Sequence, residues 1–245
     1  MPGIDLAAEL GTRGFSPPTR DRLLCTLQRA RLDLMAIASQ RALWEDVAAG
    51  NAETHAAIQC QAALRGWVVV TPVHPDASVA DLRRYLGQEA FLGAWLHPRG
   101  PSQLASDGTQ EILTAYRRYT RPLMVTVPDE AAVRDLETLA KQMPQLKVIA
   151  AGAGGDAWLA SVAAAKRAVN VMLEPFTGGC HRGKLEAMVE VLGSHRILFA
   201  TGFPAWNPGA ALGLLADAKI SDADKQAILT GNARKMFGLG QNSTG

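Results

Sequence analysis

The stretch Arg196-Ile197-Leu198-Phe199-Ala200-Thr201-Gly202-Phe203-Pro204 is a short apolar run that ends at a glycine and a proline. Similar runs recur along the chain, and most are continuously apolar rather than alternating. Continuous runs are expected of strands that are buried on both faces of a parallel sheet. We therefore predict eight strands, at Ile4–Ala7, Leu32–Ala38, Trp67–Thr71, Phe91–Leu96, Leu123–Val127, Lys147–Ala151, Asn170–Leu173 and Arg196–Ala200.

Helical patterns separate these runs, and eight strands that are each followed by a helix indicate a closed (β/α)8 barrel. The 245 residues are close to the usual size of that fold, roughly 250 residues. An extra C-terminal helix is predicted at Asp222–Met236, with Ser221 as its N-cap and Gly238 as its stop signal. The other predicted helices are Thr19–Arg31, Ala52–Arg65, Val79–Leu86, Thr109–Tyr119, Glu130–Gln142, Ala157–Ala168, Lys184–Leu192 and Ala210–Ala216.

The prediction is thus an α/β protein with one domain, a parallel TIM barrel over residues 1–239, followed by a flexible tail at residues 240–245. Trp44, Trp67, Trp95 and Trp158 lie in or beside apolar elements, so we expect them in the core. Asp107 and Asp156 each precede a helical pattern and are predicted N-caps.

The bulk composition argues against several classes of protein. A net charge of +2, from 25 basic and 23 acidic side chains, comes without any Lys/Arg-rich run, which gives nucleic-acid binding little support. No apolar run approaches the ~20 residues of a membrane span, and no signal peptide is evident. Three widely spaced cysteines fit reduced thiols. We expect a cytoplasmic protein that acts neither on a membrane nor on nucleic acid.

Two C-terminal stretches resemble the closing signature of metal-dependent amidohydrolases, which are (β/α)8 barrels. The first is Arg196–Pro204, and the second is Gly231-Asn232-Ala233-Arg234-Lys235-Met236-Phe237. In that family the first stretch usually reads R-I-L-F-G-S-D-F-P, and its Asp binds metal and takes a proton from the attacking water. Gly202 stands at that position here, and glycine can neither ligate a metal nor accept a proton.

The resemblance extends to earlier strands, where the same kind of replacement recurs. Ile4–Glu9 has the form of the family's I-D-x-H-x-H, with Ala7 and Glu9 at the two histidine positions. Arg121–Thr126 and Leu146–Gly155 resemble the fifth and sixth strands, and they place Thr126 and Gly152 at the family's histidines. Phe91–Pro98 resembles the fourth strand, F-x-G-x-x-L-H-P, and retains His97.

A hydrolytic metal site needs three or more nitrogen or oxygen ligands and an open position for water. Only Glu9 among the five matched positions could serve as one. The first hypothesis is therefore a non-catalytic amidohydrolase homologue, a pseudoenzyme with no metal and no cofactor. It would bind a small molecule at the barrel mouth or a catalytic paralogue as its partner, and analogy with the family predicts a homo-oligomer.

The alternative hypothesis is a metal-independent hydrolase or lyase that acts on a small carboxylated substrate such as a lactone. Functional groups of this fold lie on the loops after the strands. Two imidazoles there could perform acid/base chemistry, and two guanidinium groups could hold a carboxylate. The candidates are His97 and His74 as catalytic residues, with Arg99, Glu174, His181, Arg182 and Trp206 as substrate-binding residues. A lone histidine is a weak signal, and the simpler interpretation of each His-Pro pair is a turn.

A third interpretation is a dinucleotide-binding protein. Gly152–Ala157 fits G-x-G-x-x-[G/A] after a predicted strand, and Glu174 lies about 20 residues further on, where a ribose-binding acid would stand. The motif falls in the sixth unit rather than the first, and the amidohydrolase resemblance accounts for the same glycines. We rank this interpretation lowest.

Overall fold

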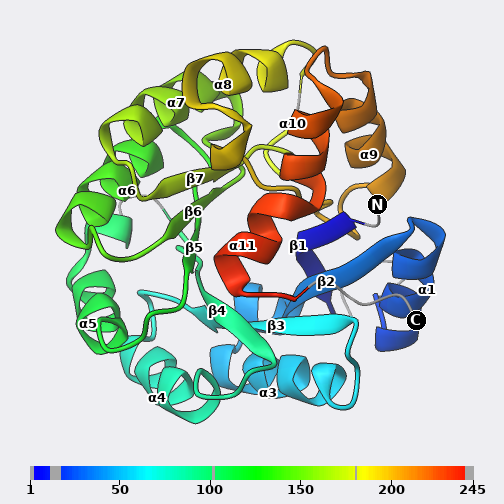
Figure 1. Cartoon of the computed structure of the whole chain (residues 1–245). Coiled ribbons are helices and arrows are strands. Elements are labelled where there is room, and N and C mark those ends of the chain that lie inside the picture. The colour runs from blue at the N-terminus through cyan, green and yellow to red at the C-terminus, as the bar shows by residue number, and fades with distance from the viewer. Residues whose placement is uncertain (1–2, 12–17, 101–102, 180, 241–245) are drawn as a thin grey trace.

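Seven parallel strands form one curled sheet in the order β1-β2-β3-β4-β5-β6-β7, so every strand pairs with its neighbour in sequence (Figure 1). The computed structural model describes residues 3–11, 18–100, 103–179 and 181–240. Each connection between paired strands contains helix, as parallel strands require. The strands are β1 Gly3–Leu10, β2 Leu32–Ser39, β3 Leu64–Val70, β4 Phe91–Leu96, β5 Leu123–Thr126, β6 Val148–Ala151 and β7 Val171–Glu174.

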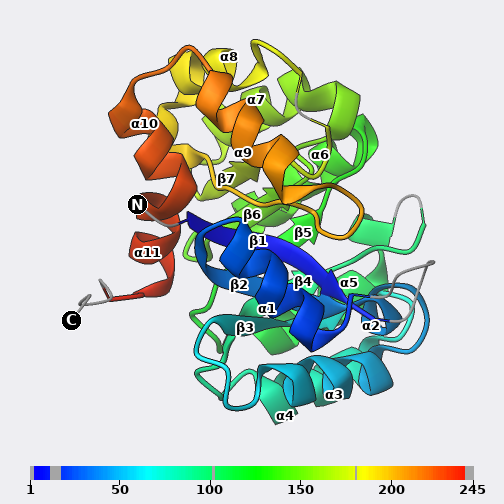
Figure 2. The ribbon, with the colours of Figure 1, turned by 90° about the vertical axis from the view of Figure 1, so that its right-hand side faces the viewer.

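Helices surround the sheet (Figures 1 and 2). Seven predicted strands are present with small shifts at their ends. Two predicted helices, Glu130–Gln142 and Lys184–Leu192, have the predicted bounds. The α-helices are α1 Arg20–Arg29, α2 Gln40–Trp44, α3 Val47–Ile58, α4 Pro75–Tyr85, α5 Asp107–Tyr116, α6 Glu130–Gln142, α7 Trp158–Arg167, α8 Lys184–Leu192, α9 Pro208–Asp217, α10 Asp222–Gln226 and α11 Asn232–Phe237.

The eighth predicted strand is not a strand of the described sheet. Its residues make one isolated parallel bridge, between Ile197 and Leu173 of β7. On the other side, Leu6 of β1 donates its backbone N–H to the carbonyl of Phe199 at 3.2 Å. The segment therefore lies between the two edges of the curled sheet, but too few ladder bonds form for a regular strand. A parallel, TIM-like α/β fold is confirmed, whereas the count of eight strands is not.

Two predicted helices differ from the structure. The predicted helix Ala52–Arg65 begins earlier, at Val47, because the Asp46 side chain accepts from Ala49 N and caps it there, and it ends at Ile58. The predicted helix Asp222–Met236 is interrupted by a π-helical turn at Ala227–Gly231. Its predicted signals are present, since Ser221 accepts from Asp224 N and Gly238 has a left-handed φ of 62°.

The two predicted aspartate caps are wrong. Ser106, one residue before Asp107, accepts from Thr109 N and caps α5. Asp156 lies inside a 3-10 turn, Gly155–Ala157, ahead of α7. A residue next to a helix start has the same sequence signal as the cap itself, so spacing alone does not separate them.

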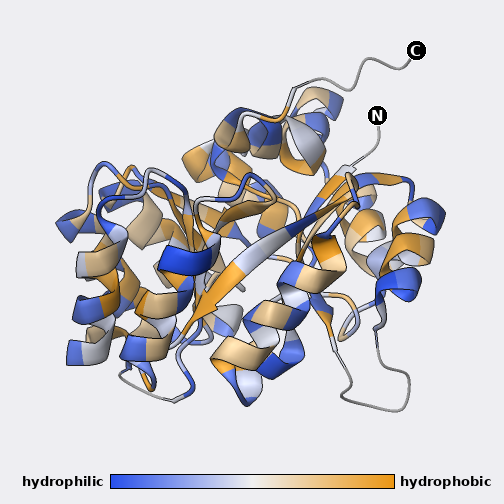
Figure 3. Ribbon diagram, turned by 90° about the horizontal axis from the view of Figure 1, so that it is seen from below, coloured by the Kyte–Doolittle hydropathy of each residue, from blue (hydrophilic) through white to orange (hydrophobic). Residues whose placement is uncertain are grey.

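The sheet has an apolar core on each side. Within β3, Val68 and Val70 pack outward against the helices, whereas Trp67 and Val69 point into the curled sheet. Figure 3 shows apolar residues along the strands and on the helix faces that cover them. This alternation is what a parallel sheet buried on both faces requires.

Helix α11 covers the end of the sheet where the strands begin (Figure 1). Arg234 forms a 2.8 Å ion pair with Asp33, near the start of β2. Phe237 packs edge-on against Trp67 with ring centroids 5.8 Å apart. This end of the barrel is therefore closed by protein, and the opposite end is left for a site.

None of the described helices is long and apolar enough to cross a membrane. The predicted flexible tail, residues 240–245, lies outside the described residues except for Gly240.

The Asn232 side chain joins α11 to the segment that precedes the isolated bridge. Its Nδ2 donates to the carbonyls of Ser194 and Ile197, both at 2.7 Å. We expect Asn232→Ala to lower the free energy of unfolding by about 1–3 kcal/mol, because two carbonyls lose their donor. Urea denaturation measures this. Lys235→Ala, an exposed change on the same helix, is the control, and equal stability of the two variants would contradict the prediction.

Candidate ligand site at the ends of the strands

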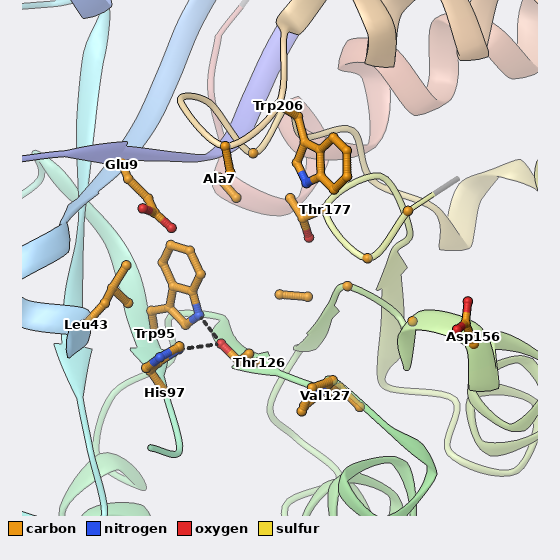
Figure 4. Close-up of a pocket in the computed structure, with 18 of the residues that line it drawn as sticks. Ala7, Glu9, Leu43, Trp95, His97, Thr126, Val127, Asp156, Thr177 and Trp206 are labelled. Carbon is orange, nitrogen blue, oxygen red and sulfur yellow. Dashed lines mark hydrogen bonds between the residues drawn. The ribbon is translucent and has the colours of Figure 1, made fainter. Parts of the chain in front are cut away.

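A cavity of about 530 Å³ opens where the strands end. Figure 4 shows residues that line it. Its walls come from the last residues of several strands and from the loops that follow them. Most of the lining is apolar or glycine backbone. The lining residues are Ala7, Glu9, Leu43, Trp44, Trp95, His97, Thr126, Val127, Pro128, Ala151, Gly152, Gly155, Asp156, Thr177, Gly178, Gly179, His181, Gly202, Ala205 and Trp206.

All five positions matched to metal ligands line this one cavity. They are Ala7, Glu9, Thr126, Gly152 and Gly202. The strand register brings them together, although they come from four separate parts of the sequence. Two of them touch directly, since Gly202 N donates to Ala7 O at 2.9 Å.

The two glycines have conformations that other residues rarely adopt. Gly152 has a φ of +79° and Gly202 a φ of +65°. A Cβ atom on Gly202 would also lie 2.9 Å from Cδ1 of Trp206 and 3.2 Å from Cγ2 of Thr177. An aspartate at 202 would therefore be strained and would displace the tryptophan.

The hydroxyl group of Thr126 is held between two rings of β4 and its following loop. Trp95 Nε1 donates to Thr126 Oγ1 at 2.8 Å, and His97 Nδ1 lies 2.9 Å from the same oxygen (Figure 4). An indole N–H can only donate, so within the described chain His97 Nδ1 is the one acceptor recorded for the threonine's proton. We therefore assign the neutral His97 ring a proton on Nε2.

His97 is a buried, neutral imidazole in the cavity wall. Only 4% of the residue is exposed. Burial, and secondarily the nearby charge of Arg99, lower its pKa from 6.5 to about 4. Its Nε2 is buried and has no hydrogen-bond partner among the described residues. The ring of Trp44 packs edge-on against it, with centroids 4.6 Å apart.

The cavity's carboxyl groups are Glu9 and Asp156. Glu9 accepts from Gln40 Nε2 at 3.0 Å. Asp156 is exposed, and its Oδ1 lies 3.6 Å from Nε2 of His181. Within the part of the chain that the structure describes, no three His, Cys, Asp or Glu side chains gather closely enough to hold a metal ion.

Arg99 holds the backbone beside the cavity and is not one of the lining residues. Its guanidinium donates to the carbonyls of Ala42 at 2.7 Å, Leu43 at 2.9 Å and Glu45 at 2.8 Å. These carbonyls lie at the C-terminal end of α2, which carries Trp44. Arg99 therefore positions the tryptophan wall and does not line the cavity.

Two further candidates from the alternative hypothesis also lie away from the lining. His74 is exposed and stands at the N-terminus of α4 without a side-chain cap bond. Arg182 borders a separate hollow beside α8 and α9. The cavity thus brings together His97, His181 and Trp206 from the predicted set, and their roles stay predictions.

Glu174 is a buried anchor for two loops of the cavity. Its carboxyl group accepts from Gly152 N at 3.1 Å, Phe176 N at 2.7 Å, Thr177 N at 3.1 Å and the Thr177 hydroxyl. Burial raises its pKa. With no exposed surface, this acid is not presented to a ribose as the dinucleotide interpretation would need.

Sequence analysis missed two features of the site. Asp5 is fully buried, accepts from Thr201 N at 2.8 Å and from Ala7 N at 3.1 Å, and burial raises its pKa to about 7. The sequence signal that could have pointed to Asp5 is its match to the Asp of the I-D-x-H-x-H form. Trp44 was expected in the core but is 49% exposed at the cavity. It ends the short helix α2, which was not predicted. Trp67 and Trp95 are buried as expected.

The curled parallel sheet, with its cavity at the ends of the strands, defines a TIM-barrel-like scaffold. The family model described as amidohydrolase matches residues 19–239, so the chain belongs to the amidohydrolase family. No curated protein sequence matches the chain.

Solved structures similar to this chain support the same scaffold. A candidate amidohydrolase from Staphylococcus aureus has 15% identity and a TM-score of 0.77, over 98% of this chain and 100% of the other. A dihydroxybenzoic acid decarboxylase from Polaromonas sp. JS666 has 17% identity and a TM-score of 0.75, over 97% of each chain. A 2,6-dihydroxybenzoate decarboxylase from Rhizobium has 15% identity and a TM-score of 0.73, over 97% and 99%. At these identities the likeness establishes the fold.

The lowered pKa of His97 predicts a pH dependence of stability. As the pH falls from 6.5 to about 4, the unfolded chain binds a proton at this histidine before the folded protein does, so stability is lost across this window. We expect the unfolding free energy of the wild type to fall by about 2–3 kcal/mol relative to His97→Gln between these pH values. Urea titrations at several pH values measure it, and a constant difference between the two proteins would contradict it.

Proposed function

We propose that this chain is an amidohydrolase-family protein that binds a small molecule at the barrel mouth without the family's metal ion. The observation that carries the proposal is the convergence of the five matched positions on one cavity. Of these, only Glu9 has a carboxyl or imidazole side chain, and a hydrolytic divalent site needs three or more such ligands. The residues present do not fit the ion.

The backbone at the glycines supports the same proposal. The left-handed φ at Gly152 and Gly202 favours glycine over histidine and aspartate. Trp206 stands against Gly202 at the place where a side chain would begin. This geometry supports an apolar wall at the position of the family's aspartate.

The structural relatives provide a contrast in the ligands they hold. The Polaromonas decarboxylase was solved with bound manganese and 2-nitroresorcinol, and a 5-carboxyvanillate decarboxylase from Novosphingobium aromaticivorans was also solved with manganese. These relatives support descent from a family whose members bind aromatic molecules. The donor set of this chain supports retention of a ligand cavity and loss of the ion.

Metal analysis tests the proposal directly. The untagged protein would be incubated with zinc or manganese, exchanged into metal-free buffer and analysed by plasma mass spectrometry. We expect far less than one equivalent of either metal, because no three His, Cys, Asp or Glu side chains of the described residues gather closely enough to hold an ion. One tightly bound equivalent that is lost in Glu9→Gln would overturn the proposal.

A restored variant makes that assay interpretable. Ala7 and Thr126 lie on strands, where histidine can replace them without a left-handed backbone. The combined variant Ala7→His and Thr126→His keeps Glu9 and offers three candidate ligands in one cavity. It is the positive control for metal retention.

A second candidate is a metal-independent lyase, and one observation favours it. His97 Nε2 is a buried imidazole nitrogen in the cavity wall without a partner among the described residues. A panel of hydroxybenzoates, assayed for released carbon dioxide, tests it. Turnover that His97→Ala abolishes would replace the first proposal with this one.

The expected homo-oligomer and the catalytic paralogue as partner are part of the same proposal. Light scattering on the purified protein tests the first, and co-purification with an active family member tests the second. A monomer that retains no paralogue would restrict the function to small-molecule binding.

A further inference from the structure

Three of the five tryptophans of the chain border the cavity. Trp95 is buried in the wall, whereas Trp44 and Trp206 are 49% and 52% exposed. Exposed indole rings around a hollow are apolar surface that a ligand can remove from water. In Figure 4, Trp206 and Trp95 lie on opposite sides of the space.

The described lining contains no lysine or arginine. Arg99 follows His97 closely in sequence, but its guanidinium donates to three carbonyls at the end of α2. A carboxylate that enters the cavity would lose hydration without gaining a cation from these walls, which is costly. The acidic side chains Glu9 and Asp156 in the lining disfavour an anion further.

The hydroxyl groups of the wall are turned toward other protein atoms. Thr126 bonds with Trp95 and His97, and the Thr177 hydroxyl donates to Glu174. Ring faces and methyl groups therefore supply most of the contact area that a ligand would meet. A cavity of about 530 Å³ is within the range of small-molecule sites, roughly 300–1,000 Å³.

We propose that the cavity binds an uncharged planar aromatic molecule of one or two rings and rejects the corresponding carboxylate. This inference rests on the metal-free binding function proposed above. The flat ligand packs against the indole rings of Trp44, Trp95 and Trp206, where stacked and edge-on contacts are favourable. The missing cation in the wall sets the preference for a neutral molecule over its carboxylate.

Isothermal titration with three matched probes tests the preference. The probes are 2-naphthol, 2-naphthoate and 2-naphthylmethylammonium at neutral pH, which share a ring system and differ in charge. We expect 2-naphthol to bind at least about tenfold more tightly than 2-naphthoate. Tighter binding of the naphthoate or of the ammonium probe, or no binding of any probe, would overturn the inference.

Variants assign the binding to the tryptophan walls. Trp206→Ala should weaken 2-naphthol about tenfold or more, and Trp206→Phe should restore most of the affinity because it keeps a ring. Leu159→Ala, at an exposed apolar side chain outside the lining, is the matched control and should leave affinity unchanged. Equal losses in Trp206→Ala and Leu159→Ala would contradict the placement.

A gain of function tests the charge argument. Ala205 is an exposed lining residue beside Trp206. Ala205→Lys should raise the affinity for 2-naphthoate about tenfold, whereas Ala205→Gln should not. An unchanged naphthoate affinity in the lysine variant would count against charge as the cause.

The metal content of the same preparation separates the two levels of the proposal. Metal-free protein that prefers 2-naphthoate would overturn the inference about the ligand and leave the proposed function in place. Protein that holds one equivalent of metal would overturn the proposed function itself.

Discussion

The carboxyl group of Asp5 joins the first strand to the stretch that lies between the two edges of the sheet. It accepts from the backbone and the hydroxyl of Thr201, 196 residues away in sequence. Ala7 and Gly202 follow these two residues along the chain and bond to each other at the cavity. A fully buried carboxyl is costly unless donors surround it, so this bond set fixes the edge of the site.

Glu174 has the same role on the other side of the cavity. Its oxygens hold the Gly152 loop and the Thr177 loop together. Arg99 completes the frame by fixing the end of α2, and with it Trp44. Two buried acids and one arginine thus hold loops in place, while most of the cavity lining is apolar or glycine.

The sequence predicted the parallel α/β fold because its strands are continuous apolar runs. Such runs can be recognised even when the predicted ends of the strands are slightly wrong. The five positions matched by resemblance line one cavity, because the order of the strands brings their ends together. The sequence did not predict α2, whose five residues are too few for a periodic pattern. Arg99 and Glu174 were candidates for ligand contact by residue type. Only the fold shows that Arg99 donates to backbone carbonyls and that Glu174 accepts from backbone N–H groups and the Thr177 hydroxyl.

The irregular form of the predicted eighth strand and the exposure of Trp44 could not be predicted from the sequence. Both depend on contacts between segments far apart in the chain, such as Leu6 with Phe199 and Trp44 with His97. The left-handed backbone at Gly202 likewise could not be predicted from the sequence. By resemblance, Gly202 is at the position of the family's aspartate, and the structure adds that a Cβ atom there would lie 2.9 Å from Cδ1 of Trp206.

Crystals of the protein soaked with manganese and 2-naphthol test the account most directly. Anomalous scattering would locate the metal, and the density map would locate the ring. The account predicts no anomalous peak in the cavity and a ring packed between Trp95 and Trp206. A manganese peak ligated by Glu9 and His97, with no ring bound, would contradict it.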